Sequence, residues 1–342
     1  MRQSGQVLEL PDGAVADHGI RSVYLDAYLA PFREWLRRET VTEILVNRPG
    51  EVWVEDAAVG AMQRFAVPEI DDVLLQRLAE QVARINHQGI NRENPLLAAT
   101  LPGGERVQLC GPPATRAHWA LAIRRHRLLE LPLEAYDHGP VAEPVVRQVP
   151  DPQREPIAYL RDAIGRRQTI LISGGTSTGK TTFLNAMLRE IPQDQRVIVV
   201  EDTAELKLPG ENGVGLIAVK GELGEARVGT DDLVQAALRL RPDRIVLGEL
   251  RGRETIGFLR AINTGHPGSF STVHANTPRG ALDQIALMAM QAGIGLTRSE
   301  TIEYAASVID LVVQLDRSGG QRRISAITPA AQLLAAPAPH RG

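Results

Sequence analysis

The sequence predicts an α/β fold for the C-terminal half of the chain, preceded by a smaller α+β domain. Beyond residue 153, short apolar runs alternate with longer amphipathic runs, a pattern typical of parallel βαβ units. A Pro-rich stretch separates this region from the residues before it. The length of 342 residues is also sufficient for about two domains.

The first domain is predicted to span residues 1–131 and to contain helices and a sheet. Pro31 suits the first turn of a helix, because the N–H group that it lacks has no partner there. Turn chemistry at 47–50 separates two β-branched runs and predicts a hairpin. We expect helices at 31–38 and 71–85, and strands at 42–46, 52–54, 106–109 and 120–124.

A domain boundary is predicted at residues 132–152, where prolines break both helices and sheet ladders. We interpret this stretch as a Pro-rich linker. The α/β domain then spans 153–329, and residues 330–342 form a frayed tail. Inside the α/β domain we expect strands at 169–173, 197–200, 245–247 and 269–273, and helices from Lys180 and at 233–240.

The composition excludes several classes of protein. A single cysteine, Cys110, rules out an intrachain disulfide and a cysteine-based zinc site. The net charge of −3 supplies no global basic field, so we expect no stable sequence-specific binding of nucleic acid. The first residues lack the apolar core of a signal peptide, and no apolar run is long enough to span a bilayer. We therefore expect a cytoplasmic protein, at most peripheral to a membrane.

A phosphate-binding loop follows the strand at 169–173 and matches the pattern G-x-x-x-x-G-K-[ST]. Glycines let backbone N–H groups turn inward around phosphates, and the helix that follows adds its positive end. Lys180 is predicted to reach the β- and γ-phosphates of a nucleotide, and Thr181 to hold Mg²⁺. The predicted cofactor-binding loop consists of Gly174, Gly175, Thr176, Ser177, Thr178, Gly179, Lys180, Thr181 and Thr182.

Two carboxylates are candidates for work on metal and water. Glu249 ends an apolar strand in the Walker B arrangement, which places an acid beside Mg²⁺, and Glu201 ends a second strand in the same way. In a doubly wound sheet both would emerge at the carboxyl edge, where ligands bind. His274 follows another short strand and is a candidate to contact a γ-phosphate, whereas the role of His266 is left open.

Four motifs in this order resemble the Walker A, Asp box, Walker B and His box of secretion-superfamily ATPases. They lie at 174–182, 201–206, 238–251 and 265–276. In the N-terminal half, the sequences at 41–55, 91–97 and 101–108 resemble the VirB-eleven class of type IV secretion system traffic ATPases. The resemblance covers roughly residues 20 to 328.

This resemblance implies a RecA-like P-loop ATPase domain and a homohexameric ring at the cytoplasmic face of the inner membrane. Such a ring hydrolyses ATP with Mg²⁺ and works with inner-membrane secretion components and coupling proteins. It powers pilus assembly or the transfer of DNA or protein substrates. By resemblance, Glu201 is a catalytic acid of the Asp box, Glu249 is the Walker B acid and a metal ligand, and His274 is the His-box residue.

Arg106 and Arg124 are further candidates for binding the nucleotide. Each lies on or beside a predicted strand of the first domain, and an arginine fork suits bidentate contacts to phosphate. Members of the resembled family carry arginines in this domain that reach the γ-phosphate. We therefore expect ATP to draw the two domains together.

Other functions remain open at this point. A type IV pilus or type II secretion assembly ATPase shares the core, although larger relatives of that branch carry a Cys-rich metal site. A P-loop GTPase needs an Asn-Lys-x-Asp motif, which the sequence lacks. A nucleic-acid motor is disfavoured by the net charge, and a nucleotide-gated scaffold without hydrolysis is a further alternative.

Overall fold

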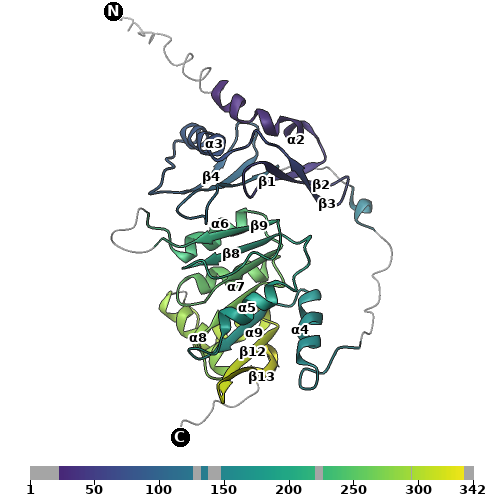
Figure 1. Ribbon diagram of the computed structural model, residues 1–342, viewed down its shortest axis with the longest axis vertical. Helices are drawn as coiled ribbons and strands as arrows, with labels where there is room; N and C mark the ends of the chain where they lie inside the picture. The colour runs from purple at the N-terminus through teal and green to yellow at the C-terminus, as the bar shows by residue number, and fades with distance from the viewer. Residues whose placement is uncertain (1–22, 126–131, 138–147, 220–225, 294, 335–342) are drawn as a thin grey trace, which may run out of the picture.

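Two domains are stacked along the long axis of the molecule in the computed structural model (Figure 1). The structure describes residues 23–125, 132–137, 148–219, 226–293 and 295–334. The expectations for residues 1–22, for 138–147 and for the end of the tail lie outside these ranges.

The N-terminal domain is built on a six-stranded antiparallel sheet with the order β3-β2-β1-β6-β5-β4. The hairpin predicted around residues 47–50 is formed by the first two strands. The strands are β1 (Val41–Val46), β2 (Glu51–Asp56), β3 (Ala61–Ala66), β4 (Leu96–Thr100), β5 (Arg106–Cys110) and β6 (Ala120–Arg124).

Helices cover one face of this sheet. Asp71 caps α3 (Asp72–Ile85) by accepting a hydrogen bond from the N–H of Leu74 at 2.7 Å. The predicted helix at 31–38 is split into η1 (Ala30–Phe32), a 3₁₀ turn, and α2 (Arg33–Arg37), and residues 23–28 are also helical. Buried side chains of these helices pack with alternate residues of β1, β2 and β6, such as Ile44, Val54 and Ile123.

The C-terminal domain contains a seven-stranded sheet with the order β13-β12-β7-β11-β10-β8-β9. Every neighbouring pair is parallel except β12 and β13. The strands are β7 (Ile170–Gly174), β8 (Val197–Glu201), β9 (Gly213–Ile217), β10 (Arg244–Leu247), β11 (Phe270–Val273), β12 (Leu311–Ser318) and β13 (Gln321–Pro329). The predicted fold class is thus confirmed, and β13 adds one antiparallel strand to it.

Helices cover both faces of the second sheet, as expected for a doubly wound fold. On one face, α4 (Pro156–Gly165) and α5 (Lys180–Leu188) pack against residues such as Ile170 and Ile172. On the other face, the intervening Leu171 belongs to an apolar cluster that includes buried residues of four helices. These are α6 (Thr230–Arg239), α7 (Glu254–Asn263), α8 (Pro278–Gln291) and α9 (Arg298–Val308).

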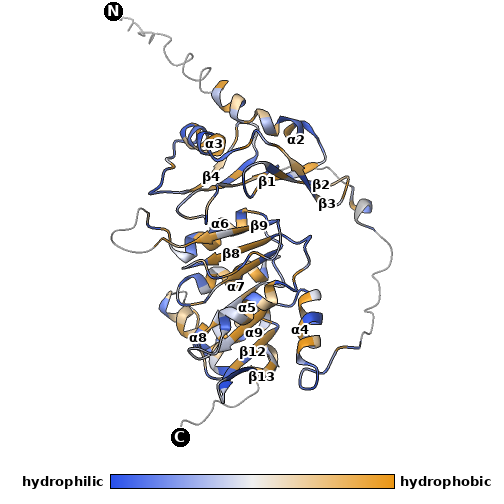
Figure 2. Cartoon of the chain, in the orientation of Figure 1, coloured by the Kyte–Doolittle hydropathy of each residue, from blue (hydrophilic) through white to orange (hydrophobic). Residues whose placement is uncertain are grey.

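The second face of the N-terminal sheet packs on the C-terminal domain. Leu45, Ala120 and Ala122 point away from α3 and join one apolar cluster with Leu216 and Leu233. Along 44–46 of β1 and 120–123 of β6, successive side chains therefore enter different cores, which explains why these residues are apolar without interruption. Figure 2 shows that the strands inside the C-terminal domain are largely hydrophobic, with more hydrophilic segments toward the outside.

Two segments differ from the expected boundaries. Residues 330–334, predicted to fray, form the 3₁₀ helix η3 (Ala330–Leu334). Ala330 and Leu333 are buried there, and the N–H of Ala330 donates to the carbonyl of Asp310 at 2.9 Å. The predicted linker contains η2 (Leu133–Tyr136) within its described part. Among the helices that the structure describes, none has both the length and the apolar character required to cross a membrane.

Replacing Arg196 by alanine should destabilise the contact between the domains. Its side chain is 0% exposed and donates to the carbonyl of Leu240 at 2.7 Å and to Oδ1 of both Asn47 and Asn212 at 2.6 Å. Arg196→Ala removes all three of these hydrogen bonds and leaves the carbonyl of Leu240 without this donor, so the free energy of unfolding in urea should fall by about 3 kcal/mol. Exposed Arg189→Ala is the control, and equal unfolding of both variants would contradict this assignment.

Candidate functional site

The phosphate loop connects β7 to α5 in a conformation that requires small residues. Gly179 is the N-cap of α5 with a φ of 89°, and Ser177 also has a positive φ of 63°. A Cβ atom on Gly174 would lie 2.5 Å from Oγ1 of Thr178, which donates to the carbonyl of Gly175 at 2.9 Å. The loop is therefore closed on itself and leaves the first N–H groups of α5 to face the space above.

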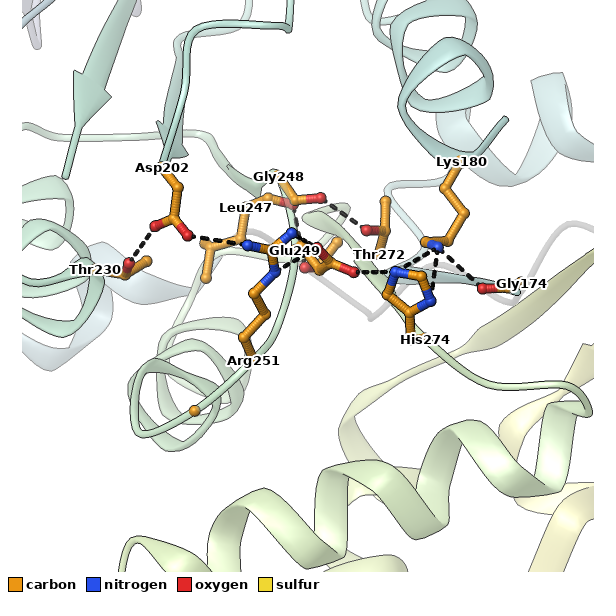
Figure 3. Close-up of polar contacts among 12 residues, drawn as sticks. Gly174, Lys180, Asp202, Thr230, Leu247, Gly248, Glu249, Arg251, Thr272 and His274 are labelled. Atoms are coloured by element: carbon orange, nitrogen blue, oxygen red, sulfur yellow. Dashed lines mark hydrogen bonds and ion pairs between the residues drawn. The ribbon is translucent and has the colours of Figure 1, made fainter. Parts of the chain in front are cut away.

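Lys180 lies at the bottom of this loop with its charge nearly out of solvent. Nζ donates to the carbonyl of Gly174 at 2.9 Å, and it lies 3.3 Å from Nε2 and 3.4 Å from Nδ1 of His274 (Figure 3). Burial lowers the pKa of Lys180, an effect that the carboxylate of Glu249 opposes. A polyanion in this site would replace the weak contacts to carbonyls and imidazole with a charge-assisted one.

A cavity of about 360 Å³ opens above the loop at the carboxyl edge of the sheet. It is lined by residues of the phosphate loop, of the ends of β8 and β10, and of β11. Four of the predicted residues that line it are Lys180, Glu201, Glu249 and His274. Of the loop, Gly175, Thr176, Ser177, Gly179, Thr181 and Thr182 line the same cavity.

Glu249 and His274 lie side by side in the wall of the cavity. Oε1 of Glu249 lies 3.1 Å from Nε2 of His274, and its carboxylate is 15% exposed. Arg251 donates to Oε2 of Glu249 and also lies 3.4 Å from Oδ2 of Asp202 (Figure 3). Oε1 is buried, and its contact with the imidazole of His274 is the one that a water molecule or a hydrated metal would displace on binding.

Glu201 has a different environment from the one expected for a water-activating acid. Oε1 accepts hydrogen bonds from the N–H groups of Glu205 at 2.9 Å and Leu206 at 2.8 Å, and Oε2 forms an ion pair with Arg116. The side chain is 3% exposed. Both oxygens are engaged, so the predicted role of Glu201 in activating water does not fit its surroundings.

The residues present fit a magnesium ion carried by a nucleotide. In the ranges that the structure covers, no three His, Cys, Asp or Glu side chains are grouped to hold a metal by themselves. Mg²⁺ usually keeps several waters and binds through one or two protein oxygens together with substrate phosphates. Thr181 and Oε1 of Glu249, once it is released from His274, would supply that kind of partial ligand set.

Arg106 and Arg124 lie outside this cavity. They are opposite each other on β5 and β6 and line a second cavity of about 340 Å³ between the N-terminal sheet and the end of α6. Arg239 and Arg241 line it as well. Within one chain, therefore, neither predicted arginine reaches the phosphate loop. Nε of Arg124 lies 3.5 Å from Glu43, whose pKa burial raises to about 7.

Three arginines were not predicted from the sequence: Arg251 and Arg322, which line the first cavity, and Arg116, which pairs with Glu201 in its wall. Arg251 follows the Walker B acid by two residues, and this proximity is a signal that sequence reasoning could have used. Arg322 is brought in by the hairpin of β12 and β13, about 140 residues after the loop, and no local pattern indicates it. His266, left open above, lies with Nδ1 3.0 Å from the carbonyl of Ala261 and does not line this cavity.

The fold and this cavity together define a class of protein. A glycine-rich loop before a helix, a buried lysine and a strand-end acid at the carboxyl edge of a parallel sheet are the features of P-loop nucleoside triphosphatases. Comparisons with known proteins place the chain more narrowly.

Residues 150–335 match the family described as Type II/IV secretion system protein. The chain is 39% identical to the type IV secretion system protein PtlH homolog of Bordetella bronchiseptica, over 88% of this chain and 93% of that protein. It is 33% identical to VirB11 of Bartonella henselae, over 87% of this chain and 91% of that protein. The fold is also similar to the crystal structure of the VirB11 ATPase from the Brucella suis type IV secretion system in complex with sulphate. The two structures superimpose with a TM-score of 0.82 at 32% sequence identity, and the match covers 93% of this chain and 98% of that one.

The chain belongs to the Type II/IV secretion system protein family, and within it is a VirB11-type type IV secretion ATPase. The resemblance noted from the sequence is thereby confirmed. The match spans both domains, which favours this class over a GTPase, a nucleic-acid motor or a scaffold without hydrolysis.

Removing the side chain of Arg322 should weaken nucleotide binding. The side chain lies over the loop because Gly179 has no Cβ, which would be 2.7 Å from Cδ of Arg322. A guanidinium there meets phosphates common to ATP and ADP, so Arg322→Ala should raise the Kd of both by about tenfold. Arg323→Ala is the matched control, since Arg323 points to the other face of β13 beside Asp316. Titration with both nucleotides measures the effect, and an unchanged Kd in Arg322→Ala would contradict it.

Proposed function

We propose that the cavity above the phosphate loop binds ATP with Mg²⁺ and hydrolyses it to drive movement between the two domains. The observation that carries the proposal is the continuous line of Lys180, His274 and Glu249 along one cavity wall. Each pair in this line is within 3.3 Å. A terminal phosphate held by Lys180 would therefore lie beside both the imidazole and the carboxylate.

Each residue of this line has a separate task. Lys180 neutralises charge on the β- and γ-phosphates, and the N–H groups of the loop at 174–182 hold the remaining phosphate oxygens. Thr181 holds Mg²⁺, which supplies charge neutralisation to the transferred phosphate when it is bound. Glu249 orients the attacking water through Oε1, the oxygen that faces His274 rather than Arg251. His274 donates to the γ-phosphate and moves with respect to Glu249 when that phosphate leaves.

The same hydrolysis would power a type IV secretion system from the cytoplasmic face of the inner membrane. The chain would act there as a peripheral homohexamer with inner-membrane components and coupling proteins, in pilus assembly, substrate transfer or both. Support comes from the relatives, which are type IV secretion system proteins and which match this chain over nearly their full length. Disrupting the chain in its host and measuring DNA transfer and protein export separately identifies the transported substrate.

Substitutions at Lys180 and Glu249 test the proposed hydrolysis. Lys180→Ala should reduce phosphate release by about 100-fold or more, because a positioned cation stabilises charge that develops on the phosphoryl group. Glu249→Gln keeps the shape of the side chain and should reduce release while ATP still binds. Arg189→Ala, exposed at the end of α5, should retain the parent rate. Normal melting together with parent rates in both site variants would refute the proposal.

The two N-terminal arginines give a test of the ring. Arg106 and Arg124 lie away from the phosphate loop of their own chain, so they can contact a nucleotide only if a second subunit brings one to them. We expect light scattering to detect a hexamer with ATP and Mg²⁺ at micromolar concentration. Arg106→Ala should then weaken ATP binding more than ADP binding. A monomer under these conditions, or equal small effects on both nucleotides, would contradict the assignment.

A further inference from the structure

A loop of the N-terminal domain closes the edge of the C-terminal sheet. It connects β5 to β6 and lies along β9, the outer strand beside β8. The N–H of Ile217 donates to the carbonyl of Ala114 at 2.8 Å, and the N–H of Arg116 donates to the carbonyl of Gly215 at 3.3 Å. The position of this loop therefore depends on how the N-terminal domain is docked.

Arg116 crosses β9 from this loop to reach Glu201. It does so at Gly215, where a Cβ atom would lie only 2.6 Å from Cδ of Arg116. Glycine within a strand weakens the strand, and close approach of another group is a recognised reason for its presence. Here it leaves the slot through which the guanidinium forms its ion pair with the buried carboxylate.

Glu201 in turn holds one wall of the nucleotide cavity. Its other oxygen accepts the N–H groups of Glu205 and Leu206, and the segment from Asp202 to Leu206 contributes four residues to the lining of that cavity. Without Arg116, a carboxylate with 3% exposure would lose the one cation that pairs with it in the described part of the chain, beside a site for phosphates. The wall would then be both looser and more negative.

We propose that Arg116 is a positioning residue that makes the nucleotide cavity dependent on docking of the N-terminal domain. When the domain is docked, Arg116 neutralises Glu201 and the turn after β8 is held in place. When the domain moves away, Glu201 loses its partner and the turn relaxes. The inference rests on the proposed hydrolysis at this cavity, and it extends that function by naming the side chain that connects domain movement to the site.

Other ion pairs join the domains without touching this cavity. Arg48 and Arg64 both pair with Glu211, and Arg241 pairs with Glu55 through Nε at 2.9 Å. None of these five residues lines the cavity. Arg64 is therefore a matched control, because its loss removes an interdomain arginine–glutamate pair but leaves the cavity wall intact.

The experiment uses the full-length chain and compares Arg116→Ala, Gly215→Ala, the double variant and Arg64→Ala. Gly215→Ala adds one methyl group and displaces Arg116 from its slot, since the side chain of Arg116 supplies the nearest atoms. The quantities measured are kcat and KM for ATP hydrolysis and the rate of hydrogen exchange at the amides of Glu205 and Leu206.

Arg116→Ala and Gly215→Ala should each lower kcat about tenfold or more, with faster exchange of both amides and a smaller change in KM. The double variant should resemble either single variant, because both changes remove the same contact. Arg64→Ala should keep the parent kcat and exchange. Additive effects, or an equal loss in Arg64→Ala, would overturn the inference in favour of a structural role. A parent protein that releases no phosphate would refute the proposed function itself.

Discussion

The unpaired N–H groups at the start of α5 are the constraint on which the rest of the site depends. A helix end directed at phosphates needs a loop without bulky side chains before it, and Gly174 and Gly179 supply that loop. Because β7 lies inside a parallel sheet, the carboxyl ends of β11, β10 and β8, the next three strands in the sheet order, meet at the same edge. The sheet thus delivers an imidazole and two carboxylates to one cavity with no further specialised structure.

Positive charge is distributed locally, in a chain whose net charge is −3. Arg251 and Arg322 line the nucleotide cavity, and Arg116 pairs with Glu201 in its wall. Arg106 and Arg124 share a second cavity with Arg239 of α6 and with Arg241, which follows α6. A general basic field would attract any polyanion, whereas arginines fixed by ion pairs select a ligand by position. In the proposed ring, the first cavity would hold the nucleotide of its own subunit, and the second could meet a phosphate only from a neighbouring subunit.

The parts that could be predicted from the sequence are those with local signals. The phosphate loop, the strand-end acids and the hairpin of β1 and β2 each depend on residues close together in the chain, and all were found at the predicted places. Arg116 and Arg322 reach the cavity through contacts between segments 85 or more residues apart, which periodicity does not encode. The prediction that residues 330–334 fray was wrong for a related reason, since the N–H of Ala330 donates to the carbonyl of Asp310, 20 residues earlier in the chain. The sequence carries a sign of the Arg116 contact at Gly215, a glycine between the apolar residues Val214 and Leu216.

Glu201 and Glu249 show why a strand-end acid does not by itself define a role. Both follow apolar strands of the same sheet, and from the sequence they are equivalent candidates. Arg251 engages Oε2 of Glu249 and His274 contacts Oε1 within the cavity, so Oε1 can accept a proton or orient water once the imidazole turns to the γ-phosphate. Arg116 and two backbone amides occupy both oxygens of Glu201, so this carboxylate can only hold its neighbours in place. The difference arises from the N-terminal domain, because it alone supplies Arg116. Docking of that domain therefore assigns the two acids their separate tasks, and a movement that withdraws Arg116 changes the chemistry of the site without displacing any residue that faces the γ-phosphate.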